Sequence, residues 1–210
     1  MSDEVARAYD AVAPQYAARF VHDLRDDDEA QAWLRRFVEL VDVAAGPVAD
    51  LGCGPGQAVA QLTAAGLPTI GVDLSEGLLA QARAALPDAD LRVGDLTALD
   101  VGDGSLGGIH ARYSIIHLPP ERLAQVFIEW ARTLAPGAPV LISFFASLRS
   151  EDHGRPFDHA VATAYELFPE TVGEVLGRAG FAEVEFGSAS PIPGGRPFGR
   201  GTVLAVRSGA

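Results

Sequence analysis

The sequence lacks the features that mark secreted and membrane-spanning proteins. It contains one cysteine, Cys53, in 210 residues, which excludes an internal disulfide framework. No apolar run approaches the roughly 20 residues that cross a bilayer, and the first ten residues, MSDEVARAYD, lack the basic and then apolar order of a signal peptide. We therefore expect a soluble, cytoplasmic protein with no membrane partner.

Positive charge is also scarce. The chain has 16 Lys and Arg residues against 28 Asp and Glu residues, a formal net charge of −12 at pH 7. Most of such a surface would repel a phosphate backbone, so nucleic acid is not expected as a partner. Metal-ligand spacing is lacking too, because His153 and His159 have aspartates beside them but no helical His pair or Cys set supports a metal site.

The length of the chain suits one α/β domain. Residues 4–20 favour a helix, which Pro14 is expected to kink or to divide in two. The acidic run at 26–29 precedes a helical apolar pattern, and we interpret it as the solvated start of a second helix. Residues 1–45 are interpreted as an N-terminal helical lid packed on a core domain of residues 46–210.

The pattern changes after Gly46 and Pro47. Short apolar runs then alternate with amphipathic segments, which is typical of repeated βα units on a parallel sheet. Strands are expected at residues 48–51, 69–72, 91–93, 106–111, 139–145, 182–186 and 202–206, and helices at 57–65, 76–85, 120–134 and 169–179. The last two strands have only a Gly/Pro-rich connection between them, so they should pair antiparallel.

The first strand runs into the first helix of this pattern through the stretch VADLGCGPGQAVAQL. Gly52, Gly54 and Gly56 leave helix N–H groups and a floor without side chains, an arrangement that admits a nucleoside or its attached chain. The dinucleotide fingerprint G-x-G-x-x-G would require a third glycine where Gln57 stands. The spacing therefore argues against a nicotinamide-dependent oxidoreductase, which stays as the less favoured alternative.

The segment DLGCGPGQ resembles the first motif of the class I S-adenosylmethionine-dependent methyltransferases. The resemblance continues through TIGVDLSEGLLAQAR, GDL and GGIHARYSIIHLPPERL to the last expected strand, and covers residues 48–206. Within the superfamily it is strongest to the small-molecule, ubiquinone-biosynthesis-like branch (methyltransferase type 11 or 25). It implies a Rossmann-like α/β fold with helices on both faces of a seven-stranded sheet, in the order 3-2-1-4-5-7-6 with strand 7 antiparallel.

The resemblance also implies roles for individual residues. Asp73 would bind the ribose hydroxyls, and Asp95 would accept a hydrogen bond from the adenine amino group. Asp50 would orient the glycine loop or contact the methionine ammonium. Arg112 or Tyr113, which flank the end of the fourth strand, could hold the methionine carboxylate or a substrate anion, or both could pack and pair locally. The full cofactor-binding set that we expect is Tyr16, Asp50, Gly52, Cys53, Gly54, Pro55, Gly56, Asp73, Leu74, Asp95, Leu96, Arg112 and Tyr113.

Two further positions within this resemblance bear on chemistry. His117, in YSIIHLPP, lies where the family places substrate-facing residues, and it is the candidate catalytic base; equally, it could cap the turn before Pro119 and Pro120. Cys53 is interpreted as a small residue that leaves room in the loop, not as a nucleophile. In the N-terminal segment, Tyr9 or Tyr16 would lie over the cofactor.

A segment at residues 146–168 is long enough to cover a pocket. Most of its charged and polar side chains should face solvent, with one or two touching substrate: Arg149, His153, Arg155, His159 and Tyr165. The function that we expect is in-line methyl transfer from S-adenosylmethionine, with S-adenosylhomocysteine as product, to a small molecule that the sequence does not identify. A non-catalytic S-adenosylmethionine-binding protein is the alternative, and either a monomer or a homodimer is expected.

Overall fold

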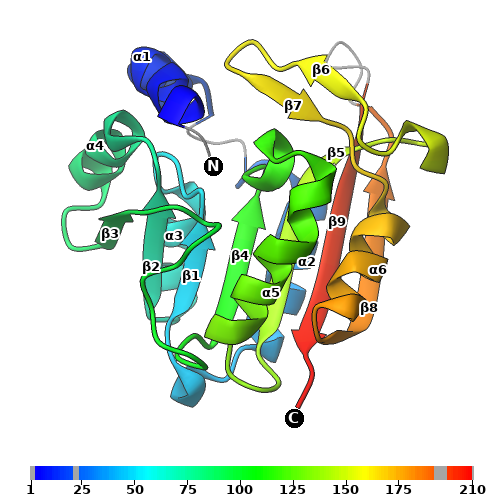
Figure 1. The fold of residues 1–210 in the computed structure, drawn as a ribbon. Coiled ribbons are helices and arrows are strands. Elements are labelled where there is room, and N and C mark those ends of the chain that lie inside the picture. The colour runs from blue at the N-terminus through cyan, green and yellow to red at the C-terminus, as the bar shows by residue number, and fades with distance from the viewer. Residues whose placement is uncertain (1–2, 21–23, 192–197, 210) are drawn as a thin grey trace.

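A seven-stranded sheet forms the centre of the computed structural model, which describes residues 3–20, 24–191 and 198–209 (Figure 1). The strand order is β3-β2-β1-β4-β5-β9-β8. The strands are β1 (Val48–Leu51), β2 (Thr69–Asp73), β3 (Asp90–Val93), β4 (Gly108–Arg112), β5 (Pro139–Ala146), β8 (Phe181–Ala189) and β9 (Gly199–Arg207). The first five are parallel, whereas β9 is antiparallel to both β5 and β8. The predicted order is confirmed, with β8 and β9 as its sixth and seventh strands.

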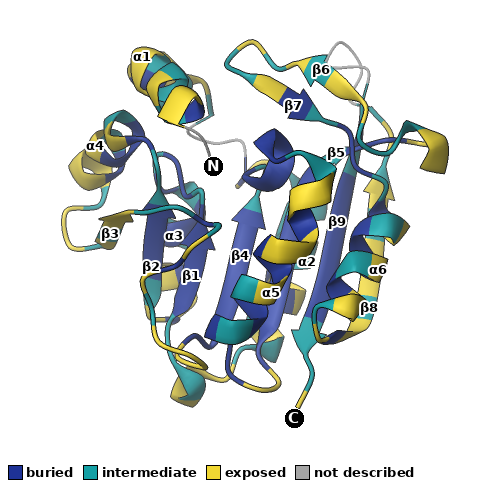
Figure 2. Ribbon diagram, viewed as in Figure 1, coloured by how far each residue is buried: buried dark blue, intermediate teal, exposed yellow. Residues whose placement is uncertain are grey.

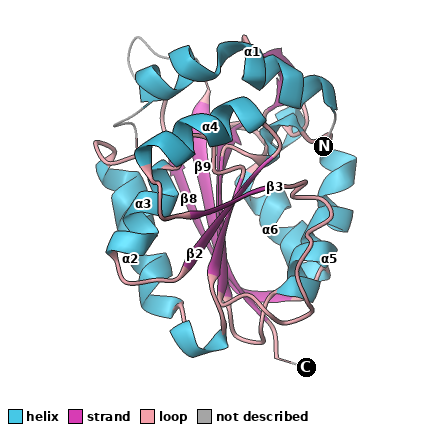
Figure 3. Cartoon of the chain, turned by 90° about the vertical axis from the view of Figure 1, so that its left-hand side faces the viewer, coloured by secondary structure: helices cyan, strands magenta, loops and turns pink. Residues whose placement is uncertain are grey.

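Helices cover both faces of this sheet. α2 (Asp28–Leu40) and α3 (Gln57–Ala64) lie on one face, and α5 (Leu123–Thr133) and α6 (Pro169–Arg178) lie on the other (Figure 3). α4 (Glu76–Ala85) packs beside β2 and β3, and α1 (Asp3–Phe20) packs on α4. The fold is therefore a doubly wound α/β fold. Its strand order reverses between β1 and β4, which is where such folds bind ligands.

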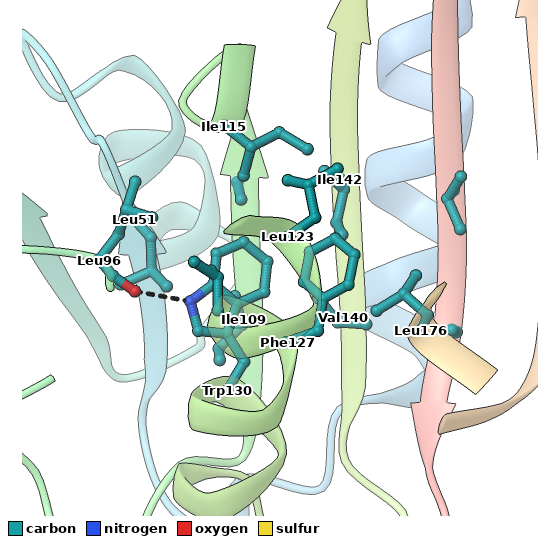
Figure 4. Packing of buried hydrophobic residues seen from close by; sticks show 14 of the residues in the cluster. Leu51, Leu96, Ile109, Ile115, Leu123, Phe127, Trp130, Val140, Ile142 and Leu176 are labelled. Carbon is teal, nitrogen blue, oxygen red and sulfur yellow. Dashed lines mark hydrogen bonds between the residues drawn. The ribbon is translucent and has the colours of Figure 1, made fainter. Parts of the chain in front are cut away.

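The main core lies between α5 and the middle of the sheet (Figure 4). Phe127 and Trp130 are fully buried there, against residues of β1, β4 and β5. The Trp130 indole N–H donates a hydrogen bond to the carbonyl of Leu96, at 2.9 Å. Every residue of β1 is buried, and the central strands are the most buried part of the sheet (Figure 2). The strands that end at the reversal point are thus packed on the main core.

Pro14 does not divide the first helix, contrary to one of the two expected outcomes. α1 runs without a break from Asp3 to Phe20 although Pro14 lacks the N–H of a regular helical turn. Tertiary contacts offset that loss, because the carboxylate of Asp10 accepts hydrogen bonds from the Ser75 hydroxyl (2.6 Å) and the Gly77 amide (2.8 Å). One side chain thereby fastens α1 to the beginning of α4.

The acidic run does begin a helix, as predicted, but it is only partly solvated. Asp27 is the N-cap of α2 and accepts a hydrogen bond from the Ala30 amide at 3.1 Å. Its carboxylate also pairs with Arg200 of β9 at 2.6 Å, and Glu29 pairs with the same guanidinium at 3.0 Å. The Asp27 side chain is consequently only 17% exposed.

A small hairpin extends from the end of the sheet at which the parallel strands finish. It consists of β6 (Pro156–Asp158) and β7 (Thr163–Tyr165), paired antiparallel, and follows a short 3-10 turn at Ser150–Asp152. The sequence predicted a covering segment here but no strands. The hairpin and α1 project at the same end of the molecule (Figure 1). None of the helices in the described ranges is long and apolar enough to cross a bilayer.

Candidate functional site

A pocket lies at the carboxyl ends of β1, β2 and β4, at the point where the strand order reverses. It encloses about 470 Å³, counting the part that is open to solvent. The glycine loop, the ends of β2 and β4, and one side of α1 contribute to its wall. The lining residues are Val5, Ala6, Tyr9, Tyr16, Gly52, Gly54, Asp73, Leu74, Ser75, Leu78, Arg112, Tyr113, Ser114 and His117.

The glycine loop needs glycine for two separate reasons. Gly52 has φ +72°, and a Cβ added to it would lie 2.3 Å from the Cβ of Ser114, so both its conformation and the space around it exclude a side chain. Gly54 has φ +53°, and a Cβ there would meet nothing within 4 Å. Gly52 therefore allows close packing against the end of β4, whereas Gly54 presents bare backbone to open space.

Asp73, at the end of β2, holds this loop in place. One carboxylate oxygen accepts a hydrogen bond from the Gly54 amide and the other accepts one from the Ser75 amide, both at 2.8 Å. Burial raises the pKa of Asp73 even though these two hydrogen bonds oppose the change. Because each carboxylate oxygen has two lone-pair directions, Asp73 can still accept hydrogen bonds from a ligand in the pocket.

Asp50 does not line the pocket. His110 of β4 donates a hydrogen bond from Nδ1 to Oδ1 of Asp50 at 2.7 Å, and both side chains are 3% exposed. The other oxygen, Oδ2, is buried without a hydrogen-bond partner among the described residues. His110 was not among the residues expected from the sequence, although Asp50 and His110 are register partners in the β1–β4 pair. The pairing of β1 with β4 places these two side chains next to each other.

Several other expected residues also lie outside the pocket lining, namely Cys53, Pro55, Gly56, Asp95 and Leu96. Cys53 packs in a small apolar cluster, and burial raises the pKa of its thiol well above its usual range, which keeps the thiol protonated. Asp95 accepts a hydrogen bond from the Thr97 amide at 2.8 Å. Leu96 is buried under α5. The pocket therefore includes the methionine side and ribose side of the expected set more fully than the adenine side.

The end of β4 places two expected residues in the wall. Tyr113 has φ +54°, a left-handed conformation that costs a non-glycine residue about 1–3 kcal/mol, and its amide donates to the Ser143 carbonyl at 2.7 Å. The Arg112 guanidinium lies over the Tyr113 ring, 4.9 Å from its centroid. It also lies 3.9 Å from the carboxylate of Asp27.

His117 joins two covering elements across the pocket. Its Nδ1 lies 2.8 Å from the carbonyl oxygen of Thr163 on β7, and its Nε2 lies 2.9 Å from the hydroxyl of Tyr9 on α1. A carbonyl can only accept, so Nδ1 carries the proton and Nε2 accepts from Tyr9. Burial lowers the pKa of His117, which favours this neutral form. The imidazole therefore bonds to distant elements, not to the turn before Pro119.

The covering segment places only one of its five expected residues beside the pocket. The ring of His159 is 5.3 Å from that of His117. His153 accepts a hydrogen bond from the Phe168 amide, Arg155 pairs with the buried Glu166, and Arg149 pairs with Glu151. Tyr165 is half-buried on β7. Within the described ranges, no group of three or more metal-binding side chains lies together.

A family model described as "Methyltransferase domain" matches residues 48–137, from β1 to the turn before β5. Two similar curated proteins are a demethylmenaquinone methyltransferase of Beutenbergia cavernae and a trans-aconitate 2-methyltransferase of Rhizobium meliloti. The first is 26% identical over 70% of this chain and 57% of its own length, and the second is 28% identical over 61% and 49%. The chain spans between about half and two thirds of the length of the curated relatives it matches.

The fold is also similar to that of a solved S-adenosylmethionine-dependent methyltransferase from Mesorhizobium loti. The two chains share 24% identity with a TM-score of 0.68, over 88% of this chain and all of the other.

Proposed function

We propose that this chain, which belongs to the class I S-adenosylmethionine-dependent methyltransferase superfamily, transfers a methyl group from S-adenosylmethionine to a small molecule. The observation that carries the proposal is the glycine loop held by Asp73 at the reversal of the strand order. Similarity to methyltransferases that act on different small molecules supports the class of acceptor but not its identity.

The residues present fit the cofactor. Gly54 offers bare backbone to open space, and Asp73 has lone pairs left for two ribose hydroxyls. Arg112 and Tyr113 would lie toward the methionine end, and Leu74 beside the ribose. When bound, S-adenosylmethionine supplies a methyl group on a positively charged sulfur, ready for in-line displacement. Holding the acceptor in line with it can contribute about 7–11 kcal/mol of the rate acceleration.

The division of the chain into an N-terminal lid and a cofactor-binding unit is part of the same proposal. Residues 1–45 would act as a lid over the cofactor unit of residues 46–210. Support comes from α1, which contributes Val5, Ala6, Tyr9 and Tyr16 to the pocket wall. The Asp10 carboxylate attaches this helix to α4. A lid of this kind would limit the access of water to the reacting atoms.

His117 is the proposed base for an acceptor that must lose a proton. Its Nε2 has the lone pair for that task, because Nδ1 already carries a proton that it donates to Thr163. The Tyr9 hydroxyl occupies the lone pair in this structure. Proton transfer to Nε2 would therefore require the Tyr9 hydrogen bond to be displaced, which would couple the position of α1 to the reaction.

We retain Asp95 and Leu96 as the proposed adenine contacts, next to the loop residues Cys53, Pro55 and Gly56. The acidic chain is proposed to act without a nucleic-acid or membrane partner, as a monomer or homodimer. A non-catalytic S-adenosylmethionine-binding protein would use the same pocket, so only turnover separates it from an enzyme. A nicotinamide enzyme is disfavoured by Gln57 in the loop.

The test is thermal unfolding of the chain with S-adenosylmethionine, S-adenosylhomocysteine or NAD, followed by an assay for S-adenosylhomocysteine release over a panel of acceptors. We expect the first two ligands to raise the unfolding temperature and NAD to leave it unchanged. Stabilisation by NAD alone would overturn the proposal. Stabilisation without release on any acceptor would favour the non-catalytic alternative.

A further inference from the structure

Five side-chain rings form a continuous cluster next to the pocket. We name it the ring subsite, and its members are Tyr113, Phe145, Phe157, His159 and Phe198. Tyr113 and Phe145 have ring centroids 4.9 Å apart, Phe145 and Phe157 5.5 Å, and Phe157 and Phe198 4.2 Å. His159 lies 5.6 Å from Phe145. The rings come from the end of β4, from β5, from the hairpin and from the residue before β9.

All five rings are half-buried, and Tyr113, Phe145 and Phe157 pack against the main core with part of each ring left accessible. Phe144 is fully buried, whereas its neighbour Phe145 points to the other face of β5 and stays partly exposed. Of the five, Tyr113 is among the lining residues of the pocket, and the other four rings lie beside it. A contiguous group of partly exposed aromatic rings beside a pocket is a candidate extension of a small-molecule site.

The ring subsite continues directly from the proposed cofactor pocket. Tyr113 belongs to both, and the His117 ring, which also lines the pocket, is 5.3 Å from His159. His117 is the proposed base at that junction. A molecule seated among the rings would therefore have one edge at His117 and at the methionine side of the pocket.

The charges around the ring subsite favour an uncharged occupant. Two arginines next to members of the ring subsite in sequence already face carboxylates: Arg112 lies 3.9 Å from Asp27, and Arg200 lies 2.6 Å from Asp27 and 3.0 Å from Glu29. The imidazole of His117 is held neutral by burial. With a net charge of −12 on the whole chain, a polyanion would gain little attraction here.

We infer that the methyl acceptor is an uncharged, flat aromatic molecule that stacks within the ring subsite. This inference rests on the proposed function, because it identifies the acceptor of that same reaction. For an acceptor with a ring hydroxyl, an oxygen lone pair forms the new O–C bond. The C–S bond breaks with its electron pair returning to sulfur, and the hydroxyl proton passes to Nε2 of His117.

Three compounds test the acceptor class on the full chain saturated with S-adenosylhomocysteine. The probes are 1-naphthol, the saturated ring alcohol cyclohexanol, and citrate as a polyanion, with affinity measured by ligand-observed NMR titration. We expect 1-naphthol to bind and the other two to bind at least about tenfold more weakly, because only an aromatic ring gains the edge-to-face and stacked contacts. Equal or tighter binding of cyclohexanol or citrate, or no binding of 1-naphthol, would overturn the inference.

Three phenylalanine variants locate the binding. Phe157→Ala and Phe198→Ala should each weaken the binding of 1-naphthol by about tenfold. Phe186→Ala removes a ring that is 45% exposed on β8, away from the ring subsite, and should leave the affinity unchanged. Unchanged affinity in both ring-subsite variants contradicts the inference.

The thermal shift with S-adenosylhomocysteine is measured on every variant. A retained shift shows that the fold and the cofactor pocket survive the substitution. If the affinity for 1-naphthol is then unchanged in the ring-subsite variants, the result counts against the inferred acceptor class alone. If S-adenosylhomocysteine produced no thermal shift in the unmodified chain, that result would instead overturn the proposed function.

Discussion

The hydroxyl of Tyr9 lies 2.9 Å from Nε2 of His117, and Nδ1 of the same imidazole lies 2.8 Å from the Thr163 carbonyl. One buried side chain thus connects the first helix of the chain to the hairpin that follows β5. Both elements extend beyond the end of the sheet (Figure 1), and displacement of either one would break a hydrogen bond to His117. The protonation state of His117 is therefore linked to the position of its two covers.

Substitution of Tyr9 by Phe tests this link. The variant keeps the ring but loses the hydroxyl donor to Nε2, so we expect a loss of about 0.5–1.5 kcal/mol in the free energy of unfolding. The pKa of His117 should rise, because the lost hydrogen bond stabilised the neutral imidazole. Denaturant unfolding and NMR titration of the histidines measure the two effects. Tyr165→Phe, on the hairpin, is the matched control and should not move the His117 pKa.

The pH dependence of stability has a definite sign at His117. Burial lowers the folded-state pKa below its ordinary value of 6.5, so the unfolded chain binds the proton more readily than the folded chain. The stability that depends on a neutral His117 is complete above pH 6.5, and it is lost as the pH falls from there through the folded-state pKa. His117→Gln should make the stability curve flatter in that range. A curve that is equally steep in the variant would show that other groups cause the decline.

Asp73 is expected to determine cofactor binding. At a ligand concentration of 100 times Kd, binding adds about 2.7 kcal/mol to the free energy of unfolding. Asp73→Ala should abolish that gain, since it removes both the support of the Gly54 amide and the proposed ribose contact. Asp88→Ala, an exposed carboxylate in a turn, is the control and should keep the gain. A full ligand-dependent shift in Asp73→Ala would show that the ribose contact is elsewhere.

Two glycines with similar backbone conformation allow the cost of backbone strain to be distinguished from the cost of a steric clash. Gly52 (φ +72°) and Gly66 (φ +86°) both have left-handed backbone, but only at Gly52 would a Cβ clash, at 2.3 Å from Ser114. Gly66→Ala should cost about 1 kcal/mol from backbone strain alone. Gly52→Ala should cost more and should also weaken S-adenosylhomocysteine binding, as calorimetry can measure. Similar losses in the two variants would mean that the end of β4 moves aside.

The repetitive part of the fold could be read from the sequence. Alternating apolar runs and amphipathic segments predict the strands and helices of the sheet, and the order of the strands follows from the resemblance carried by Gly52, Asp73 and their neighbours. These signals are local or regularly spaced, so no knowledge of distant contacts is needed. Asp73 and His117 reach the pocket because Asp73 is the last residue of β2 and His117 follows β4, and both strands end there.

The rest of the site depends on residues that meet only in the folded chain. His110 reaches Asp50 through strand pairing, and Arg200 reaches Asp27 across 173 positions of sequence. The strands of the hairpin have three residues each, too few to show a two-residue period. Pro14 stays inside a helix because Asp10 fastens that helix to α4, which no local propensity predicts.

The antiparallel insertion of β9 between β5 and β8 affects the order in which the protein can be completed during synthesis. Until residues 199–207 have left the ribosome, β5 has a partner only on its β4 side, and its eight residues are an unprotected apolar edge. The same late segment brings Arg200 to Asp27 and follows directly after Phe198. All the lining residues of the pocket lie between Val5 and His117, whereas Phe198 of the ring subsite comes late in the sequence. With the roles proposed above, a nascent chain would pass through a state that has the residues for the cofactor before it has all the residues for an acceptor.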